Sequence, residues 1–217
     1  MVRVVSLDFS GTLVSPDLVD YFWLELVPEL YSKRQGIWLS EAKDEVYTAY
    51  EEVGKDKLRW YLPKYWFERF GIGDQLDRSI AETAARMKTY PDVPSLRALS
   101  ESYRLIICSN LSDEFLKCFV PRLEIGEEGY FSTVSAFSCP AKRRDFYAGV
   151  AKALEVDPPE FVHVGDDLRA DFEAPLSAGW KAILLDRQGQ HPEVSPRVGS
   201  LASLRPVIEG LTVKATA

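Results

Sequence analysis

The stretch VVSLDFSGTLVS, residues 4–15, is the part of this sequence that decides the fold. Apolar residues run directly into Asp8, and a turn of small residues follows with Ser10, Gly11 and Thr12. A short apolar run of this kind is typical of a buried strand, and the turn marks its carboxyl end. The first strand is therefore expected to present a carboxylate at its tip.

Other short apolar runs predict further strands of the same sheet. Helical patterns, such as residues 95–101 and 144–154, lie between them. Alternating strands and helices indicate an α/β fold whose core is a Rossmann-like, doubly wound parallel sheet, with functional residues at the carboxyl ends of the strands. The predicted strands cover residues 2–9, 103–110, 161–167 and 181–186, and a weaker candidate covers 131–137.

The segment from residue 15 to about residue 90 differs in character from the rest of the chain. It is rich in helical patterns and aromatic residues, and it lacks a convincing strand. The proline-containing stretch 91–94 marks its end, because proline punctuates element boundaries. We therefore predict an all-helical cap domain over residues 15–90, inserted into a catalytic core of residues 1–14 and 91–217.

Composition and charge exclude several classes of partner. The chain has 217 residues, 46% of them hydrophobic and 27% charged, which is ordinary for a globular protein. A net charge of −7, with lysines and arginines scattered, argues against nucleic acid or an anionic membrane surface as a partner. No apolar run approaches the ~20 residues that a membrane span needs.

The cysteines and the N-terminal stretch bear on the compartment. Cys108, Cys118 and Cys139 show no metal-ligand spacing, and their odd number is simplest to explain in a reducing environment. We expect no secretory signal, because Asp8 interrupts the first apolar run. These features predict a cytoplasmic protein, a monomer or a homodimer, that acts on a small molecule.

Three motifs in chain order resemble those of the haloacid dehalogenase superfamily. The first motif of that superfamily, D-x-D-G-T, stands here as DFSGT at residues 8–12. The second, an apolar strand ending in Ser or Thr, stands as IICSN with Ser109, and the fourth, G-D-D-x-x-x-x-D, as residues 165–171. The predicted helical insert lies where the superfamily places its cap. The resemblance covers nearly the whole chain and implies a hydrolase.

This resemblance implies a phosphatase that acts on a small phosphorylated metabolite through an aspartyl-phosphate intermediate. Asp8 would be the nucleophile, and Asp8 with Asp166 would hold Mg²⁺, a hard cation that prefers carboxylate oxygens and water. The backbone carbonyl of Ser10 would contribute to the same ion, and Asp171 would support it through water or an outer contact. The ion would offset the negative charge that keeps a carboxylate away from a phosphoryl group.

The resemblance also implies which residues bind the phosphoryl oxygens. Ser109 would donate its hydroxyl group, joined by backbone N–H groups after Asp8 and at Asn110. Thr12 would brace the first turn or contact the same oxygens.

A cation is expected from the superfamily's third motif. Lys142 is our choice, pairing with Asp8 and with the phosphoryl group. The local sequence PAKRR departs from the common Lys-Pro pattern, so Arg143 and Arg144 remain alternatives. Only one of the three cations need be functional.

Ser10 occupies the position at which phosphatases of this superfamily carry a second aspartate. That aspartate protonates the leaving oxygen and then activates the hydrolytic water, and a hydroxyl group does neither well. Because general acid or base catalysis is worth about 10²–10⁴ in rate, Ser10 predicts a slow phosphatase or one suited to good leaving groups. Two alternatives stay open. One is a 2-haloacid dehalogenase or phosphonate-type hydrolase that uses Asp8, and the other is a catalytically weak phosphate-binding protein.

Some candidates also have a purely structural interpretation. Asp167 and Asp171 could be solvated charges. His163, within a predicted strand, is more often a satisfied core histidine than a base. The aromatic residues of the cap are expected to be mostly core, with some exposed ones closing over the mouth of the site.

Overall fold

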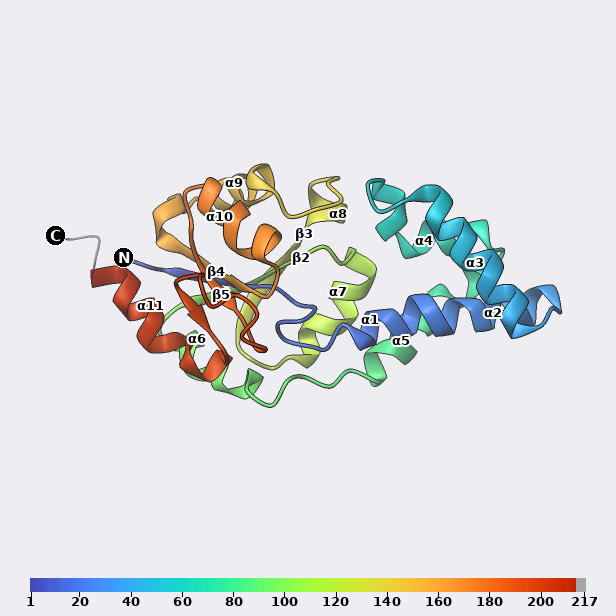
Figure 1. The fold of residues 1–217 in the computed structure, drawn as a ribbon, viewed down its shortest axis with the longest axis horizontal. Coiled ribbons are helices and arrows are strands. Elements are labelled where there is room, and N and C mark those ends of the chain that lie inside the picture. Colours follow the sequence, from blue (N-terminus) through green and yellow to red (C-terminus); the bar gives the residue numbers. More distant parts are fainter. Residues whose placement is uncertain (214–217) are drawn as a thin grey trace.

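A computed structural model describes residues 1–213, and a six-stranded parallel sheet forms the centre of the fold (Figure 1). The strand order β3-β2-β1-β4-β5-β6 starts in the middle and turns outward in both directions, which confirms the predicted α/β, Rossmann-like class. The strands are β1 (Val4–Leu7), β2 (Arg104–Ser109), β3 (Glu127–Ser132), β4 (Phe161–Gly165), β5 (Lys181–Leu185) and β6 (Arg197–Val198).

The register of the central strands brings three candidate residues to one edge. Leu7 of β1 pairs with Ile107 of β2 on one side and with Val164 of β4 on the other. Because parallel strands end at the same edge of a sheet, the residues just beyond these pairs lie close together. The edge therefore carries Asp8, Ser109 and Asp166 close together.

Alternate residues of the strands face opposite layers of helices. Val5 and Leu7 belong to a core cluster shared with α7 (Asp113–Phe119) and α11 (Leu204–Val213), while Val4 packs in a second cluster against α9 (Arg144–Leu154). This is the period-two alternation of a sheet buried on both faces. Figure 1 shows α9 and α10 (Ala174–Ser177) on one side of the sheet, and α6 (Arg97–Ser100) and α11 on the other.

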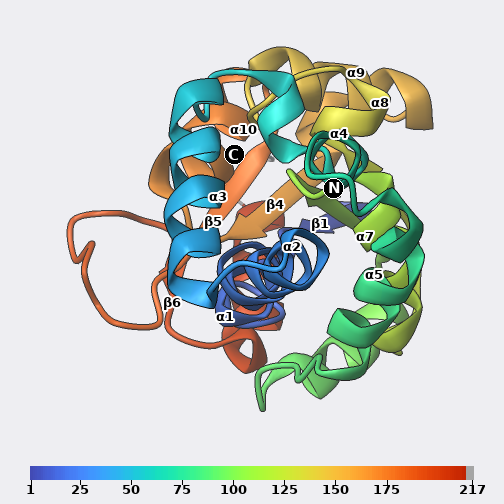
Figure 2. The same cartoon turned by 90° about the vertical axis from the view of Figure 1, so that its right-hand side faces the viewer.

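Between β1 and β2 the chain forms a group of helices that projects from the edge carrying Asp8. Figure 2 shows α3 and α5 on opposite sides of this group, with α1 and α2 seen nearly end-on between them. Its elements are α1 (Asp17–Asp20), a π-helical turn (Tyr21–Leu26), α2 (Val27–Gln35), α3 (Leu39–Val53), a 3₁₀ turn (Leu58–Tyr61), α4 (Pro63–Arg69), a second 3₁₀ turn (Gly73–Gln75) and α5 (Leu76–Ala85). The limits 15 and 90 of a separate cap domain stay a prediction, and residues 214–217 of the predicted core lie outside the described residues.

Aromatic rings form the centre of this helical group and its contact with the sheet layer. Phe22, Trp66 and Phe67 are fully buried. The ring of Phe22 lies 5.6 Å from that of Phe67 and 4.7 Å, edge on, from that of Phe115 in α7. Such pairs stabilise a fold by about 0.5–1.5 kcal/mol beyond the area they bury. The helices are therefore packed firmly against the sheet layer at this point.

Arg187 contacts both of the segments that join the helices to the sheet. Arg187, just after β5, donates to the carbonyl oxygen of Thr12 at 2.9 Å and forms two hydrogen bonds to Asp92. Its guanidinium group lies 4.1 Å from the ring centre of Tyr90, whose N–H group donates to the carbonyl oxygen of Leu13. Arg187 thus contacts both the segment that leads from β1 into the helices, at Thr12, and the segment that leads back to the sheet, at Tyr90 and Asp92.

Some elements differ from the sequence prediction. The weak candidate strand at 131–137 was wrong in its limits, because β3 covers Glu127–Ser132 and the residues after it form α8 (Thr133–Ala136). β3 lies at the sheet edge and is rich in polar residues, so its apolar pattern is weak. The two-residue edge strand β6 was not predicted.

None of the helices within residues 1–213 combines the length and the apolar character that a bilayer crossing demands.

Candidate active site

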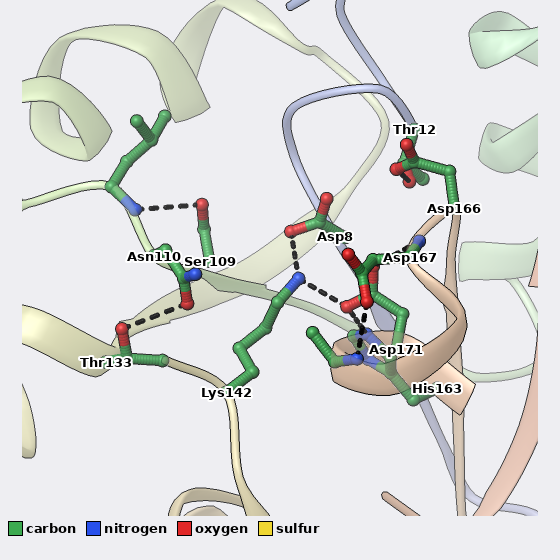
Figure 3. A network of polar contacts seen from close by, with 12 residues as sticks. Asp8, Thr12, Ser109, Asn110, Thr133, Lys142, His163, Asp166, Asp167 and Asp171 are labelled. Carbon is green, nitrogen blue, oxygen red and sulfur yellow. Dashed lines mark hydrogen bonds and ion pairs between the residues drawn. The ribbon is translucent and has the colours of Figure 1, made fainter. Parts of the chain in front are cut away.

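A buried cluster of charges lies at the tip of β1. The Nζ atom of Lys142 is 2.5 Å from Oδ1 of Asp8 and also contacts Oδ1 of Asp171 (Figure 3). Asp8 is 6% exposed and Lys142 is 5% exposed. Arg143 and Arg144, the two alternatives to Lys142, have exposed side chains. Of the three neighbouring cations, the structure brings Lys142 to Asp8.

Asp171 forms a hydrogen bond with His163 of β4. It lies in a π-helical turn (Leu168–Glu173) and is fully buried, which excludes the interpretation of a solvated charge. Its Oδ1 atom lies 3.0 Å from Nε2 of His163, and the Nδ1 atom of that ring lies 2.8 Å from the hydroxyl of Ser6. His163 is therefore a satisfied core histidine that fixes Asp171.

Asp166, just after β4, is locked against the turn that follows Asp8. The hydroxyl of Thr12 donates to Oδ1 of Asp166 at 3.0 Å. Gly11 has a φ of +86°, and a Cβ atom there would lie only 2.2 Å from Oδ2 of Asp166. Only glycine adopts this conformation easily and leaves room for the carboxylate. Gly11 thus leaves space for the Asp166 carboxylate, and Thr12 binds it.

Thr12 does not reach the cavity described below. It is fully buried, and its hydroxyl is directed to Asp166. The expected contact of Thr12 with the substrate stays a prediction, and the hydroxyl group orients the Asp166 carboxylate. The companion expectation, that Thr12 braces the turn, agrees with this geometry.

Asp167 has a different environment from its neighbour Asp166. It is exposed, and its Oδ1 atom accepts the backbone N–H groups of Arg169 and Ala170 at 2.9 and 2.7 Å. These are the bonds of a helix cap. Asp167 therefore starts the π-helical turn on which Asp171 lies.

Ser109 and Asn110 follow β2 beside Asp8. The oxygen of the buried Ser109 hydroxyl accepts the N–H group of Leu111 at 3.2 Å, which leaves its own proton free to be donated. The side-chain oxygen of Asn110 accepts the hydroxyl of Thr133 at 3.1 Å. Figure 3 shows both residues on the side of Lys142 away from Asp166.

A cavity of about 330 Å³ lies over these residues, between the sheet edge and the helical group. The structure brings seven of the predicted site residues to it: Asp8, Ser10, Ser109, Asn110, Lys142, Asp166 and Asp171. It also brings side chains that the sequence analysis did not single out, above all Asp20 in α1, Trp23 in the π-helical turn that follows, and Trp60 in a 3₁₀ turn. The aromatic content of the segment was the sequence signal for the two tryptophans, and Asp20 had none.

Comparison with known proteins identifies the family. The family model described as haloacid dehalogenase-like hydrolase matches residues 2–179. The chain belongs to the haloacid dehalogenase-like hydrolases. Within this group it is similar to the GMP/IMP nucleotidase YrfG of Escherichia coli (strain K12), with 33% identity over 185 residues, 84% of this chain and 82% of that protein.

Solved structures share the hydrolase fold. A HAD phosphatase from Thermococcus onnurineus superposes with a TM-score of 0.76 at 21% identity, over 96% of this chain and 98% of the other. A 2-haloacid dehalogenase from Pseudomonas syringae pv. Tomato gives 0.69 at 17% identity, over 97% and 99%. At these identities the likeness concerns the fold, and the two proteins are named for different reactions.

The electrostatics of this hydrolase site favour a cation. Burial raises the pKa of Asp8 to about 8, although Lys142 opposes the change. Burial also acts on Asp171, but there the charge of Lys142 and the hydrogen bond from His163 prevail and hold its pKa below the usual range. Oxygens of Asp8, Asp166 and Asp171 all lie within 4.8 Å of one another. A single ammonium group does not balance three carboxyl groups, so the donor set fits a divalent ion.

Proposed function

We propose that this hydrolase is a Mg²⁺-dependent phosphatase that forms an aspartyl phosphate on Asp8. The observation that carries the proposal is the buried contact between Asp8 and Lys142 at the floor of a cavity whose other ionised side chains are carboxylates. Such a cavity repels a phosphate ester unless cationic charge is present beside the nucleophile. Lys142 provides part of that charge, and a divalent ion would provide the rest.

The carboxylates and the turn after Asp8 fit such an ion. Asp8 and Asp166 would be its side-chain ligands, with the backbone carbonyl of Ser10, because both oxygens of Asp171 already have partners in the protein. Asp171 would support the ion from behind. When bound, Mg²⁺ offsets the charge of the phosphoryl group and of the attacking carboxylate.

The chain's own residues perform the remaining tasks. Ser109 donates its free hydroxyl proton to a phosphoryl oxygen, and the N–H group of Asn110 binds another. Lys142 holds the Asp8 carboxylate in position while an Asp8 oxygen attacks phosphorus and the ester P–O bond breaks. Water then attacks the same phosphorus atom, releases phosphate and regenerates Asp8.

For the substrate we propose nucleoside 5′-monophosphates, the class to which the name of the Escherichia coli relative points. A second cavity of about 430 Å³ supports this choice, because it shares Asp20, Trp23 and Trp60 with the first and is otherwise lined by the helical group. The hydroxyl groups of Tyr47 and Tyr50 donate to backbone carbonyls, so these residues present ring surface to the second cavity. Aromatic surface of this kind suits the stacking of a nucleobase.

The test is a substrate panel with and without a chelator. We expect wild-type protein with Mg²⁺ to release phosphate from GMP or IMP faster than from sugar phosphates of similar size. Asp8→Asn and EDTA should each abolish the release. Halide release from 2-chloropropionate that survives EDTA would instead establish the dehalogenase alternative, and an absence of both products would leave a phosphate-binding protein.

Compartment and assembly complete the proposal. All three cysteines are free, which supports a reducing cytoplasm. We propose a monomer or a homodimer, to be checked by light scattering of the purified protein.

A further inference from the structure

Alkyl phosphate esters need a proton donor that Ser10 does not provide. The leaving alkoxide of a nucleotide or sugar phosphate is a strong base, and protonating it as the P–O bond breaks is worth about 10²–10⁴ in rate. The donor must reach the oxygen that joins the phosphoryl group to the rest of the substrate. The donor must therefore be a titratable group of the cavity that no other group engages.

Two of the five carboxyl groups that line the cavity are bound by Lys142. Its Nζ atom lies 2.5 Å from Asp8 and also contacts Asp171. Asp8 is the proposed nucleophile and cannot also be the acid. Asp171 is fully buried and additionally bound to His163, so it has no access to a leaving oxygen.

Three other titratable groups have partners as well. Asp166 accepts the Thr12 hydroxyl and is a proposed ligand of the metal. Asp167 accepts two backbone N–H groups as a cap. The phenol of Tyr61 donates its proton to the carbonyl oxygen of Lys55. None of these groups is free to exchange a proton with the substrate.

Asp20 is the remaining carboxyl group of the cavity. Within residues 1–213, no side chain or backbone group forms a hydrogen bond or ion pair with its carboxylate, and the residue is exposed. Leu18 and Phe22 are buried on the opposite side of the same helical stretch. Their burial fixes the rotation of this stretch, so that Asp20 and Trp23 are directed into the cavity.

The position of Asp20 also matches the leaving oxygen. Asp20, Trp23 and Trp60 are the residues shared by the first cavity, which contains Asp8, and the second cavity, which the helical group lines. A substrate with its phosphoryl group at Asp8 and its organic part in the second cavity would extend across this junction, with its bridging oxygen on the path between the two cavities. Of the three shared residues, Asp20 is the one with an acidic group.

We propose that Asp20 is the general acid and base that replaces the aspartate missing at Ser10. In the first step an Asp8 oxygen bonds to phosphorus, the ester P–O bond breaks, and the Asp20 carboxylic acid gives its proton to the leaving oxygen. In the second step a water oxygen bonds to phosphorus, its proton passes to the Asp20 carboxylate, and the bond between phosphorus and Asp8 breaks. Phosphate leaves, and Asp20 is again protonated. The inference rests on the proposed phosphatase function.

The test compares two leaving groups in Asp20→Asn. For GMP and glycerol 2-phosphate, whose leaving groups are alkoxides, kcat/KM should fall about 10²-fold or more. With p-nitrophenyl phosphate, whose leaving group needs no proton, the first step should survive. The variant should then release a stoichiometric burst of nitrophenolate and stop as a phosphorylated protein, visible by intact mass spectrometry after acid quench.

Two variants complete the experiment. Ser10→Asp in the Asp20→Asn background should restore turnover of the alkyl esters, because it returns a carboxyl group to the same oxygen. Asp17→Asn removes a charge from the same helix, where the carboxylate accepts the Ser15 hydroxyl, and should leave both activities unchanged.

Three results separate the possibilities. Wild-type turnover of the alkyl esters by Asp20→Asn would overturn the proposal. So would an equal loss on both kinds of ester without a burst, since that pattern indicates damage to the fold or to substrate binding. If the wild-type protein releases phosphate from none of the three esters, the proposed function itself fails.

Discussion

Lys142 and Asp8 are separated by 134 positions in sequence, yet their side chains lie 2.5 Å apart in a buried contact. The ammonium group also contacts Asp171, so one cation orients two carboxylates that follow different strands. A buried charge that loses its partner is costly, and it also changes the ionisation of its neighbours. The proposed nucleophile therefore depends on a residue of the loop that precedes α9.

Lys142→Ala should lower kcat/KM about 10²–10³-fold, because the Asp8 carboxylate loses the group that orients it and offsets its charge. Steady-state phosphate release checks this. Arg143→Ala and Arg144→Ala are the matched controls and should retain activity, since both side chains are exposed. Full activity in Lys142→Ala with loss in either control would move the cationic role to the arginine.

Mg²⁺ binding should depend on pH through Asp8. Burial raises the pKa of this group to about 8 in the metal-free protein, so below that value the ion must displace a proton to bind. The apparent affinity should therefore rise about tenfold per pH unit from pH 6 toward 8 and level off above. Titration calorimetry in two buffers of different ionisation enthalpy measures the released proton. A flat affinity over this range, equal to that of Asp8→Asn, would contradict the assignment.

Gly11→Ala should disable the site. The new Cβ atom would collide with Asp166, and the positive φ adds a backbone cost of roughly 1–2 kcal/mol. Gly36→Ala is the control, because Gly36 also has a positive φ but has open space around it. In urea denaturation, we expect the strained backbone to lower the free energy of unfolding of both variants by a similar amount. Only Gly11→Ala should also lose Mg²⁺ binding and phosphate release.

His163→Leu should reduce the free energy of unfolding by about 2–4 kcal/mol, since it leaves Ser6 and Asp171 without their buried partner. Urea denaturation measures the change. His191→Ala, in the segment after β5, is the control and should stay within about 0.5 kcal/mol of wild type. Equal stability of the two variants would show that the buried network contributes little.

The sheet and the order of its motifs were predictable from the sequence. Residues 4–7, 104–109, 161–165 and 181–185 are apolar enough to identify the inner strands, and the polar residues at their carboxyl ends identify the functional edge. The limits of β3 were not predicted correctly, because an edge strand with Glu127 and Glu128 has no clear apolar pattern. Local pattern therefore identifies buried strands far better than edge strands.

The site was only partly predictable. Asp8 and Asp166 could be found because each ends a strand, and Asp171 through the spacing of its motif. Which of Lys142, Arg143 and Arg144 lies beside Asp8 depends on the conformation of the loop before α9. The amino-acid composition of the loop does not determine that conformation. Asp20 could not be found, because nothing in a helical segment tells which of its exposed acids faces a cavity formed with distant residues.

The contacts of Arg187 fix the turn after Asp8 without involving the helical group. Since this residue ties both connecting segments to the end of β5, the turn that carries Thr12 is anchored independently of the helices between those segments. Substitutions along the helices can then alter the second cavity without moving Asp8. Apart from Asp20, whose proposed role belongs to the chemistry, this part of the sequence is therefore free to diverge faster than the turn after Asp8.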